Sequence, residues 1–336
     1  MTDWKELHDH MIVIDATCPL LHDKAMTAWY REGGATAVAP TVGGFRGGAA
    51  HTVKALGGWL KHIRETPGLR HVTAASDIED AKAAGELGLI FHFQGTDPIE
   101  ESHDAIDAYA ALGVGMIQLC YNAKNRIGDG AGERTDAGLS DFGIAAIERM
   151  NANRVVVDCA HTGYRTTMEA VEASSAPVVV SHANAKAVCD NRRNVPDDLI
   201  EAVAKSGGLV GTVGFPAFLG PETRPTLDRF IDDIAYKAKL VGIEHVGLGI
   251  DYFPGQHPVA DEAAAMARYE MRLSDASGWR AEDYPPPPYH FPEGIETPRT
   301  LGNLTRGLLE RGFAEDEVRQ VMGLNWLRVF REVWGG

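Results

Sequence analysis

Two histidines occupy matching places in the chain, each at the end of a short apolar run. His161 closes the run 155–161 and His182 closes the run 177–182, 21 residues further on. A helix-length segment separates the two runs, which predicts two consecutive parallel strands of a βαβ unit. Both imidazoles would then reach the same edge of the sheet, close enough to bind one metal ion.

The rest of the chain shows the alternation of strands and helices that this arrangement needs. Helical patterns cover 104–112, 141–150, 196–205 and 227–241, and a further helix is predicted at the C-terminus, over 315–334. Strand–helix units repeated eight times predict parallel pairing and an α/β fold, a single (β/α)8 barrel of the TIM type. The eight runs that predict strands are 11–16, 37–42, 88–94, 114–121, 155–161, 177–182, 209–215 and 245–251, with a ninth short run at 72–75 as a competitor for second place.

The predicted domain organisation is one barrel domain over 1–336 with loop insertions at about 30–50 and 274–298. The second insertion contains the run Tyr284-Pro285-Pro286-Pro287-Pro288-Tyr289, which is too stiff for a helix or a central strand. A doubly wound open sheet is the main alternative fold. No glycine-rich dinucleotide fingerprint follows the first strand, and the glycines at 128–132 are interpreted as a surface loop.

Composition and charge narrow the classes of partner. The hydrophobic fraction of 44% and the charged fraction of 24% are those of a soluble globular protein. A net charge of −15 argues against nucleic acid and against anionic membranes as partners. The start of the chain has no signal-peptide pattern, and the four widely spaced cysteines indicate reduced thiols, so a cytoplasmic location is expected. The partner is expected to be a small-molecule substrate, and assembly into a homo-oligomer is left open.

Polar residues at the ends of the predicted strands are candidates for a site, because the carboxyl ends of barrel strands form the functional rim. Among them, His161, His182 and Asp251 form a set of nitrogen and oxygen ligands that suits Zn²⁺ or a similar divalent ion. A single histidine at a strand end is usually structural, but two on successive strands favour a site. The full set of strand-end residues is Asp15, Gln94, Tyr121, His161, His182 and Asp251.

At this point the residues resemble a known family. Several short stretches are similar in type and order to those of the membrane dipeptidase (renal dipeptidase) family of the amidohydrolase superfamily. Each stretch is weak alone, but the ordered set is specific and covers nearly the whole chain. The stretches are 119–122, 128–130, 138–143, 158–161, 181–182, 192–198, 247–251 and 323–328.

The resemblance implies a (β/α)8 barrel with two zinc ions and a bridging water that attacks a dipeptide amide. His161 and His182 match the histidines that bind one ion, and Asp251 matches the aspartate that binds the other and shuttles the proton. Arg193 matches the arginine that pairs with the substrate carboxylate. A planar guanidinium suits that role, although a solvated charge at a helix start is the structural alternative.

The chain departs from the family pattern at several ligand positions. The His-x-Asp pair of the first strand is replaced by Thr17 and Pro19, and the bridging glutamate of the third strand by Gln94. Tyr121 replaces the histidine that polarises the scissile carbonyl, and its hydroxyl can still donate a hydrogen bond. Two close metal ions need compensating carboxylates, so the sequence predicts one divalent ion rather than two, with zinc as the first candidate and an empty site as the alternative.

These observations predict a dipeptidase-like metal-dependent hydrolase of a small substrate with a carboxylate beside an amide or another C–N bond. A metal-activated water would be the nucleophile, Asp251 the proton shuttle and Arg193 the carboxylate ligand, while Tyr121 and Gln94 would contact the carbonyl oxygen. The alternative is a non-hydrolytic barrel that binds a small anionic ligand, or a metal-independent enzyme on the same scaffold.

Overall fold

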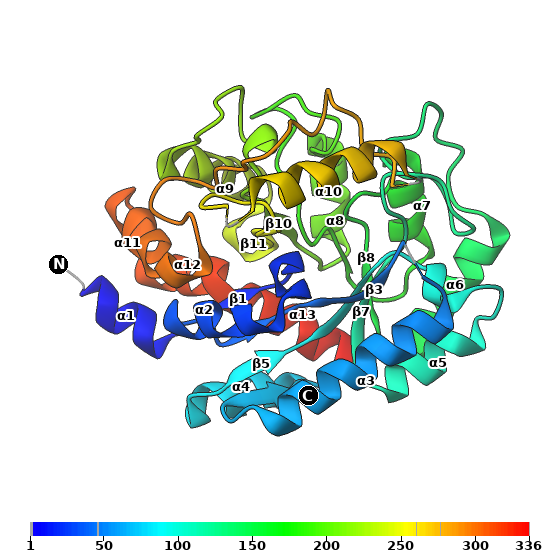
Figure 1. Ribbon diagram of the computed structural model, residues 1–336, viewed down its shortest axis with the longest axis horizontal. Helices are drawn as coiled ribbons and strands as arrows, with labels where there is room; N and C mark the ends of the chain where they lie inside the picture. The colour runs from blue at the N-terminus through cyan, green and yellow to red at the C-terminus, as the bar shows by residue number, and fades with distance from the viewer. Residues whose placement is uncertain (1–2, 46, 260, 276, 336) are drawn as a thin grey trace.

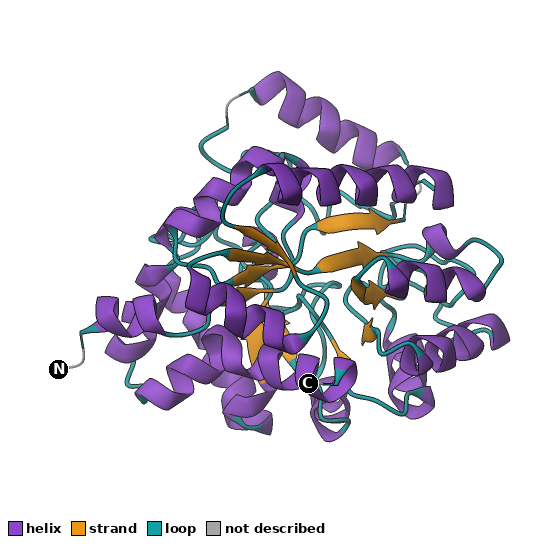
Figure 2. Ribbon diagram, turned by 90° about the horizontal axis from the view of Figure 1, so that it is seen from below, coloured by secondary structure: helices purple, strands orange, loops and turns teal. Residues whose placement is uncertain are grey.

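The computed structural model describes residues 3–45, 47–259, 261–275 and 277–335, in which parallel strands gather at the centre and helices surround them (Figures 1 and 2). The predicted α/β barrel fold is confirmed, although its ladder is divided into sheets of the order β1-β2-β5-β4, β3-β6-β7-β8-β9 and β10-β11. The strands are β1 (Ile14–Asp15), β2 (Ala37–Val38), β3 (Thr41–Gly44), β4 (Leu69–His71), β5 (Leu87–Leu89), β6 (Phe91–Gln94), β7 (Val114–Gln118), β8 (Val156–Asp158), β9 (Val178–Val179), β10 (Val210–Thr212) and β11 (Val246–Leu248).

Backbone hydrogen bonds continue across the breaks between the sheets. A parallel bridge joins Val180 to Val210, which links β9 to β10. The amide of Ala16 donates to the carbonyl of Leu248 at 3.2 Å, which links β11 back to β1. The strands therefore succeed one another around the centre in the order that the sequence predicts, and their carboxyl ends meet on one rim.

The helices pack their apolar faces against this ring. The predicted helix 227–241 is reproduced at both ends by α9, and the others agree to within two residues. The helices are α1 (Trp4–His10), α2 (Thr27–Glu32), α3 (Ala49–Glu65), α4 (Ala75–Ala84), α5 (Asp104–Ala111), α6 (Asp141–Ala152), α7 (Tyr164–Ala173), α8 (Asp197–Lys205), α9 (Leu227–Val241), α10 (Glu262–Ser274), α11 (Gly302–Glu310), α12 (Glu315–Arg319) and α13 (Asn325–Trp334).

Three local expectations need correction. The segment 30–50 is not one loop insertion, because it contains β2 and β3, which pair with β5 and β6. The ninth run at 72–75 lies just after a short strand, β4, which pairs with β5 at the edge of its sheet. The C-terminal helix is interrupted by a π-helical turn, Gln320–Leu324, between α12 and α13. The described part of 275–297 is irregular, as its proline run predicts.

The amino-terminal end of the barrel is closed by α13. Trp326, Phe330 and Trp334 lie one turn apart on its buried face and belong to an apolar cluster with side chains of the strands, such as Ile14 and Met116. The indole nitrogen of Trp326 donates to the carbonyl of Leu248 at 2.9 Å. The helix thus anchors the end of the barrel opposite the rim.

Within the described part of the chain, no helix combines the length and the apolar character that crossing a membrane requires.

Candidate functional site

The structure brings the two predicted histidines together. The ring centroids of His161 and His182 lie 4.8 Å apart, and both side chains are buried. Two glycines make room for the strand that carries His182, because a Cβ atom on Gly211 or Gly249 would lie 1.9 Å from the carbonyl oxygen of Ser181. The sequence prediction of two adjacent imidazoles on neighbouring strands therefore agrees with the geometry.

Hydrogen bonds fix which nitrogen of each imidazole carries the proton. His161 Nδ1 donates to Asn122 Oδ1 at 2.7 Å. Ser181 Oγ donates to Asp158 Oδ2 at 2.6 Å, so its lone pair accepts from His182 Nδ1 at 2.8 Å. The Nε2 atom of His182 is buried and has no hydrogen-bond partner among the described residues. Burial, and then the charge of Arg193, hold the pKa of both imidazoles well below the usual histidine value, so both are neutral.

Asp158 organises the layer beneath the histidine pair. Its carboxylate accepts hydrogen bonds from Ser181 and from the backbone amides of Ala160 and Ser181, and it contacts His92 Nε2 at 3.1 Å. Burial alone would raise its pKa, but His92 and Ser181 bring that pKa below the usual aspartate value. The carboxylate is therefore ionised, and it holds His182 in the tautomer that leaves Nε2 free.

Asp251 lies at the end of the eighth barrel strand, after β11. Burial raises the pKa of its carboxyl to about 8, with Arg193 opposing and Asp15 adding to the shift. His161 and Asp251 have φ of 62° and 64°, in the left-handed region that non-glycine residues rarely adopt. Strained backbone of this kind gathers at functional sites, and here it occurs at two of the predicted site residues.

Arg193 is the buried cation of this region. Its side chain is 4% exposed, Nη2 donates to the carbonyl of His182 at 3.4 Å, and the guanidinium stacks on Phe218 at 5.5 Å. Its Nε has no hydrogen-bond partner among the described residues. Arg193 and His161 both line a cavity of about 410 Å³, so the guanidinium is buried at the wall of a cavity and is not a solvated charge at a helix start.

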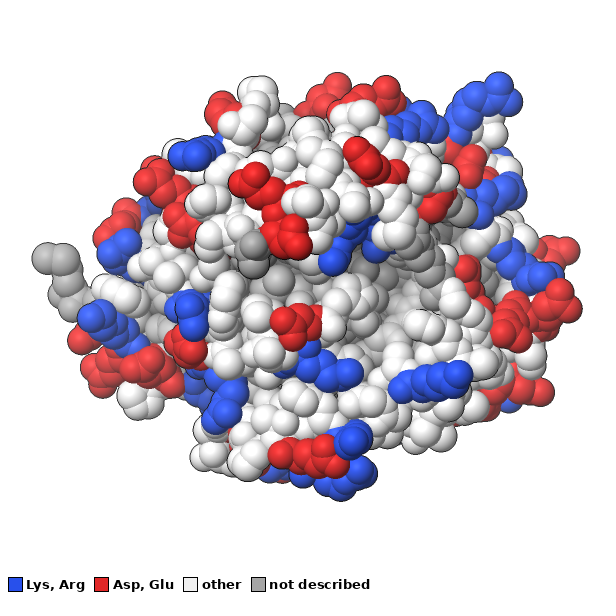
Figure 3. Space-filling view, viewed as in Figure 1, with Lys and Arg blue, Asp and Glu red and all other residues white. Residues whose placement is uncertain are grey.

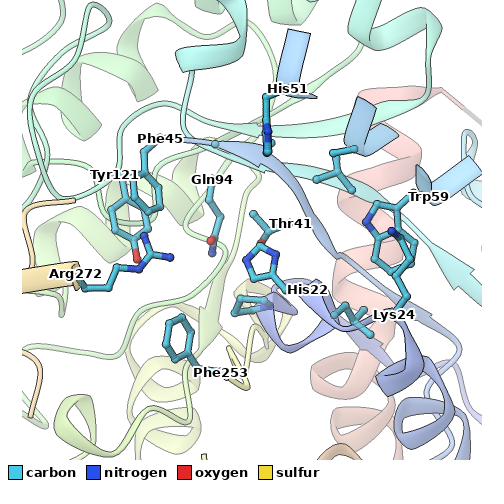
Figure 4. A pocket seen from close by; sticks show the side chains of 16 residues that line it. His22, Lys24, Thr41, Phe45, His51, Trp59, Gln94, Tyr121, Phe253 and Arg272 are labelled. Atoms are coloured by element: carbon cyan, nitrogen blue, oxygen red, sulfur yellow. The ribbon is translucent and has the colours of Figure 1, made fainter. Parts of the chain in front are cut away.

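Tyr121 and Gln94 line a second cavity of about 350 Å³ (Figure 4). The ring of Tyr121 lies between Phe45, which lines this cavity, and His161, because it stacks on His161 at 4.0 Å and on Phe45 at 3.9 Å. The side-chain amide of Gln94 points into the cavity, and His92, two residues earlier, lies deeper in the barrel. Thr17 Oγ1 lies 3.3 Å from His182 Nδ1, so it contacts a histidine where the family pattern has a metal ligand.

The histidine pair fits a metal ion in its donor chemistry and its tautomers. Neutral imidazoles with Nδ1 hydrogen-bonded and Nε2 free are the form that metal ions bind. In the ranges that the structure describes, no group of three His, Cys, Asp or Glu side chains converges closely enough to hold an ion. The pair would supply two coordination positions to an ion, and metal binding, with Asp251 as a third ligand, stays a prediction.

Sequence reasoning missed the residues that cover the rim. Trp279 Nε1 donates to the Tyr121 hydroxyl at 3.2 Å, and Tyr284 contacts Asn122 at 2.9 Å, so the segment after α10 forms an aromatic wall. Arg272 of α10 stacks over Phe45 at 4.8 Å. The aromatic residues around the proline run were the available signal for the wall, whereas nothing near Arg272 in the sequence marked it.

Comparisons with known proteins agree with this geometry. Residues 61–273 match the family described as membrane dipeptidase (Peptidase family M19). An uncharacterised dipeptidase of Schizosaccharomyces pombe is 29% identical over 79% of this chain and 58% of its own length, and dipeptidase 3 of Rattus norvegicus is 27% identical over 80% and 49%. The chain thus spans about half the length of these curated relatives.

The solved structure of an amidohydrolase from Pseudomonas aeruginosa superposes on this chain with a TM-score of 0.90 and 32% sequence identity. The match covers the full length of both chains. The family match covers more than half of the chain, and the structural match covers all of it. The chain therefore belongs to the membrane dipeptidase family, Peptidase family M19.

Proposed function

We propose that the protein hydrolyses an amide or related C–N bond in a small substrate that carries a carboxylate. The observation that supports this most strongly is Arg193, whose buried guanidinium keeps an unpartnered Nε beside the histidine pair. A buried donor without a partner is costly, and a bidentate carboxylate would satisfy it. The family of the chain supplies the class of reaction.

Each residue of the site has a separate role in such a hydrolysis. Arg193 holds the carboxylate and so fixes the scissile bond near Asp251. The raised pKa of Asp251 keeps its carboxyl protonated at neutral pH, and a bound divalent cation would lower that pKa, so that the carboxylate could take a proton from the attacking water and return it to the leaving nitrogen. The hydroxyl of Tyr121 accepts from Trp279, so its own proton stays available for the scissile carbonyl oxygen. The Gln94 amide can donate to the same oxygen.

One divalent ion, zinc in the first place, would be held by His161 and His182 with Asp251. When bound, such an ion polarises water and the substrate carbonyl. The loss of the His-x-Asp pair and of the bridging glutamate makes ordinary dipeptides poor substrates in this proposal. A cytoplasmic location is proposed as well, consistent with four free cysteines, of which Cys18, Cys120 and Cys159 are buried.

Metal content tests the cofactor. The protein is purified without chelator and analysed by plasma emission spectrometry beside the double variant His161→Ala/His182→Ala. We expect about one equivalent of metal per chain, lost in the double variant, because both imidazoles supply ligands. Near two equivalents would contradict a mononuclear site, and no metal after incubation with zinc would contradict metal-dependent hydrolysis.

Hydrolysis tests the substrate class. Amides with a free carboxylate are compared with the same amides blocked as carboxamides, in the natural protein and in Arg193→Met. We expect the natural protein to prefer the free carboxylates, and Arg193→Met to lower their kcat/KM by about 100-fold. Equal rates for free and blocked substrates would overturn the role of Arg193. Binding of carboxylates without any hydrolysis would favour the alternative, a barrel that binds a small anion.

A further inference from the structure

The cavity beside Tyr121 has an unusual set of charges for this protein. Four basic residues line it, and the part of its lining that the structure describes includes neither aspartate nor glutamate, although the chain carries a net charge of −15. The surface shown in Figure 3 is hollowed between α10 and α3, the helices that supply two of these residues. The basic residues are His22, Lys24, His51 and Arg272. Such a cavity attracts an anion and repels a cation.

Among these four basic residues, Arg272 has hydrogen-bond donors that the described residues leave without a partner. Its guanidinium lies over the ring of Phe45 at 4.8 Å, which holds it against the cavity wall. Both Nε and Nη1 are buried and lack a hydrogen-bond partner among the described residues. Figure 4 shows the guanidinium beside Tyr121 and Phe45, on the side of the cavity where the amide of Gln94 projects. An oxyanion in the cavity would satisfy donors that the protein leaves open.

The opposite wall also carries positive charge. Lys24 Nζ lies 5.1 Å from the centroid of the Trp59 ring and supplies this charge (Figure 4). Burial lowers the pKa of His22 to about 4, so its imidazole is neutral at neutral pH. The aromatic rings of Phe45 and Trp59 line the cavity and limit its width. They favour a ligand that carries its anionic group on a flat or flexible apolar chain.

Tyr121 borders both this cavity and the proposed reaction centre. One face of its ring contacts His161, and the other contacts Phe45, on which Arg272 stacks. The charges of Arg272 and Arg193 both lower the pKa of Tyr121 against the larger effect of burial, so both arginines lie within electrostatic reach of its hydroxyl. The two unsatisfied guanidinium groups therefore stand on either side of the residue that is proposed to contact the scissile carbonyl.

We propose that the Arg272 cavity binds a second anionic group of the substrate, so that the natural substrate is a dicarboxylate. One carboxylate pairs with Arg193, the other pairs with Arg272, and the hydrolysed C–N bond lies between them. A dipeptide or N-acyl compound whose acyl portion carries an acidic side chain has this layout. The inference deepens the proposed function and rests on it for the position of the scissile bond.

Matched substrates and an uncleavable pair test this proposal. Hydrolysis of Glu-Ala and Gln-Ala is compared, because the two differ by one charge at nearly equal size. Binding of their ketomethylene isosteres, which cannot be hydrolysed, is measured by calorimetry. We expect the glutamyl isostere to bind the natural protein about 10- to 100-fold more tightly than the glutaminyl isostere, as a charge-assisted contact implies. Arg272→Met should bring that ratio close to one.

Arg299→Met serves as the matched control. Arg299 also stacks on an aromatic ring, Trp29, at 4.8 Å, but it does not line the cavity, so this variant should keep the full preference for the glutamyl isostere. A preference that survives in Arg272→Met, or equal binding of the two isosteres to the natural protein, would overturn the second anion site. Selective binding without hydrolysis would leave that site in place and contradict the proposed hydrolase instead.

Discussion

At the rim, burial shifts the pKa of single side chains, and such shifts make the stability of the fold depend on pH. Asp15 is the clearest example. Its side chain is fully buried, Oδ1 accepts from the amide of Ile250 at 2.8 Å, and Oδ2 has no partner among the described residues. Burial raises the pKa of this carboxyl from 3.8 to about 7. The folded protein therefore binds a proton here that the unfolded chain has already released at neutral pH.

The sign of the pH dependence follows from that difference. Because the folded pKa lies above the unfolded one, the contribution of Asp15 to stability is complete below about pH 4 and is lost as the pH rises to about 7. The loss is at most roughly 4 kcal/mol, and Asp15→Asn, which mimics the protonated form, should remove this part of the pH dependence. Urea unfolding at pH 5 and pH 8 measures it. Asp316→Asn, at an exposed site, is the control, and an unchanged pH dependence in Asp15→Asn would contradict the prediction.

At the scale of elements, α9 fixes the segment that carries His182 and Arg193. Lys237 and Asp233 are fully buried and form an ion pair at 2.7 Å. Asp233 accepts from the amide of Ala185 at 2.7 Å, and Lys237 donates to the carbonyl of Ala183 at 3.3 Å. One turn of α9 thus holds the backbone immediately after His182.

Breaking the ion pair between Lys237 and Asp233 should lower the free energy of unfolding. Lys237→Met leaves the charge of Asp233 buried without a partner, and we expect a loss of about 3–5 kcal/mol in the free energy of unfolding. The double variant Asp233→Asn/Lys237→Met keeps an acceptor for Ala185 and removes both charges, so it should recover much of the loss. Lys239→Met, exposed on the same helix, is the control in chemical denaturation. Equal stabilities of the Lys237 and Lys239 variants would refute the assignment.

At the scale of the whole molecule, the rim depends on the closure of the opposite end of the barrel. Trp326 is fully buried, and a Cβ atom on Gly247 would lie 2.7 Å from its Nε1, so this glycine admits the indole against β11. The same strand leads to Asp251 three residues after its end. Packing of α13 therefore supports both the barrel and the position of a proposed site residue.

Removing this packing should weaken the whole fold. Trp326→Ala should lower the free energy of unfolding by about 3–5 kcal/mol, because it leaves a cavity and removes one of the two hydrogen bonds that the Leu248 carbonyl accepts. Trp326→Phe retains most of the ring and should lose less. Thermal and urea unfolding followed by tryptophan-independent far-UV dichroism measures both variants. A stable Trp326→Ala protein would show that α13 contributes little to the closure.

The sequence by itself determined the features that have a local signature. Apolar runs and turn residues repeat along the chain at strand and helix spacing, so the alternation of elements and the adjacency of His161 and His182 were predictable. Arg193 has no local signature of this kind, and it was predictable only from the resemblance of 192–198 to a stretch of the family. The replaced ligand positions, Thr17 and Gln94, were likewise predictable only from that resemblance.

Only the tertiary structure decided which distant residues complete the site. Trp279 and Tyr121 are 158 positions apart, and Asn122 and Tyr284 are 162 apart, so no periodicity within one segment connects them. Arg272 stands on an ordinary amphipathic helix, and it gains its proposed role because α10 packs over Phe45. Local patterns fix where the chain turns and which face is buried, whereas contacts across the rim arise only when the barrel brings separate loops together.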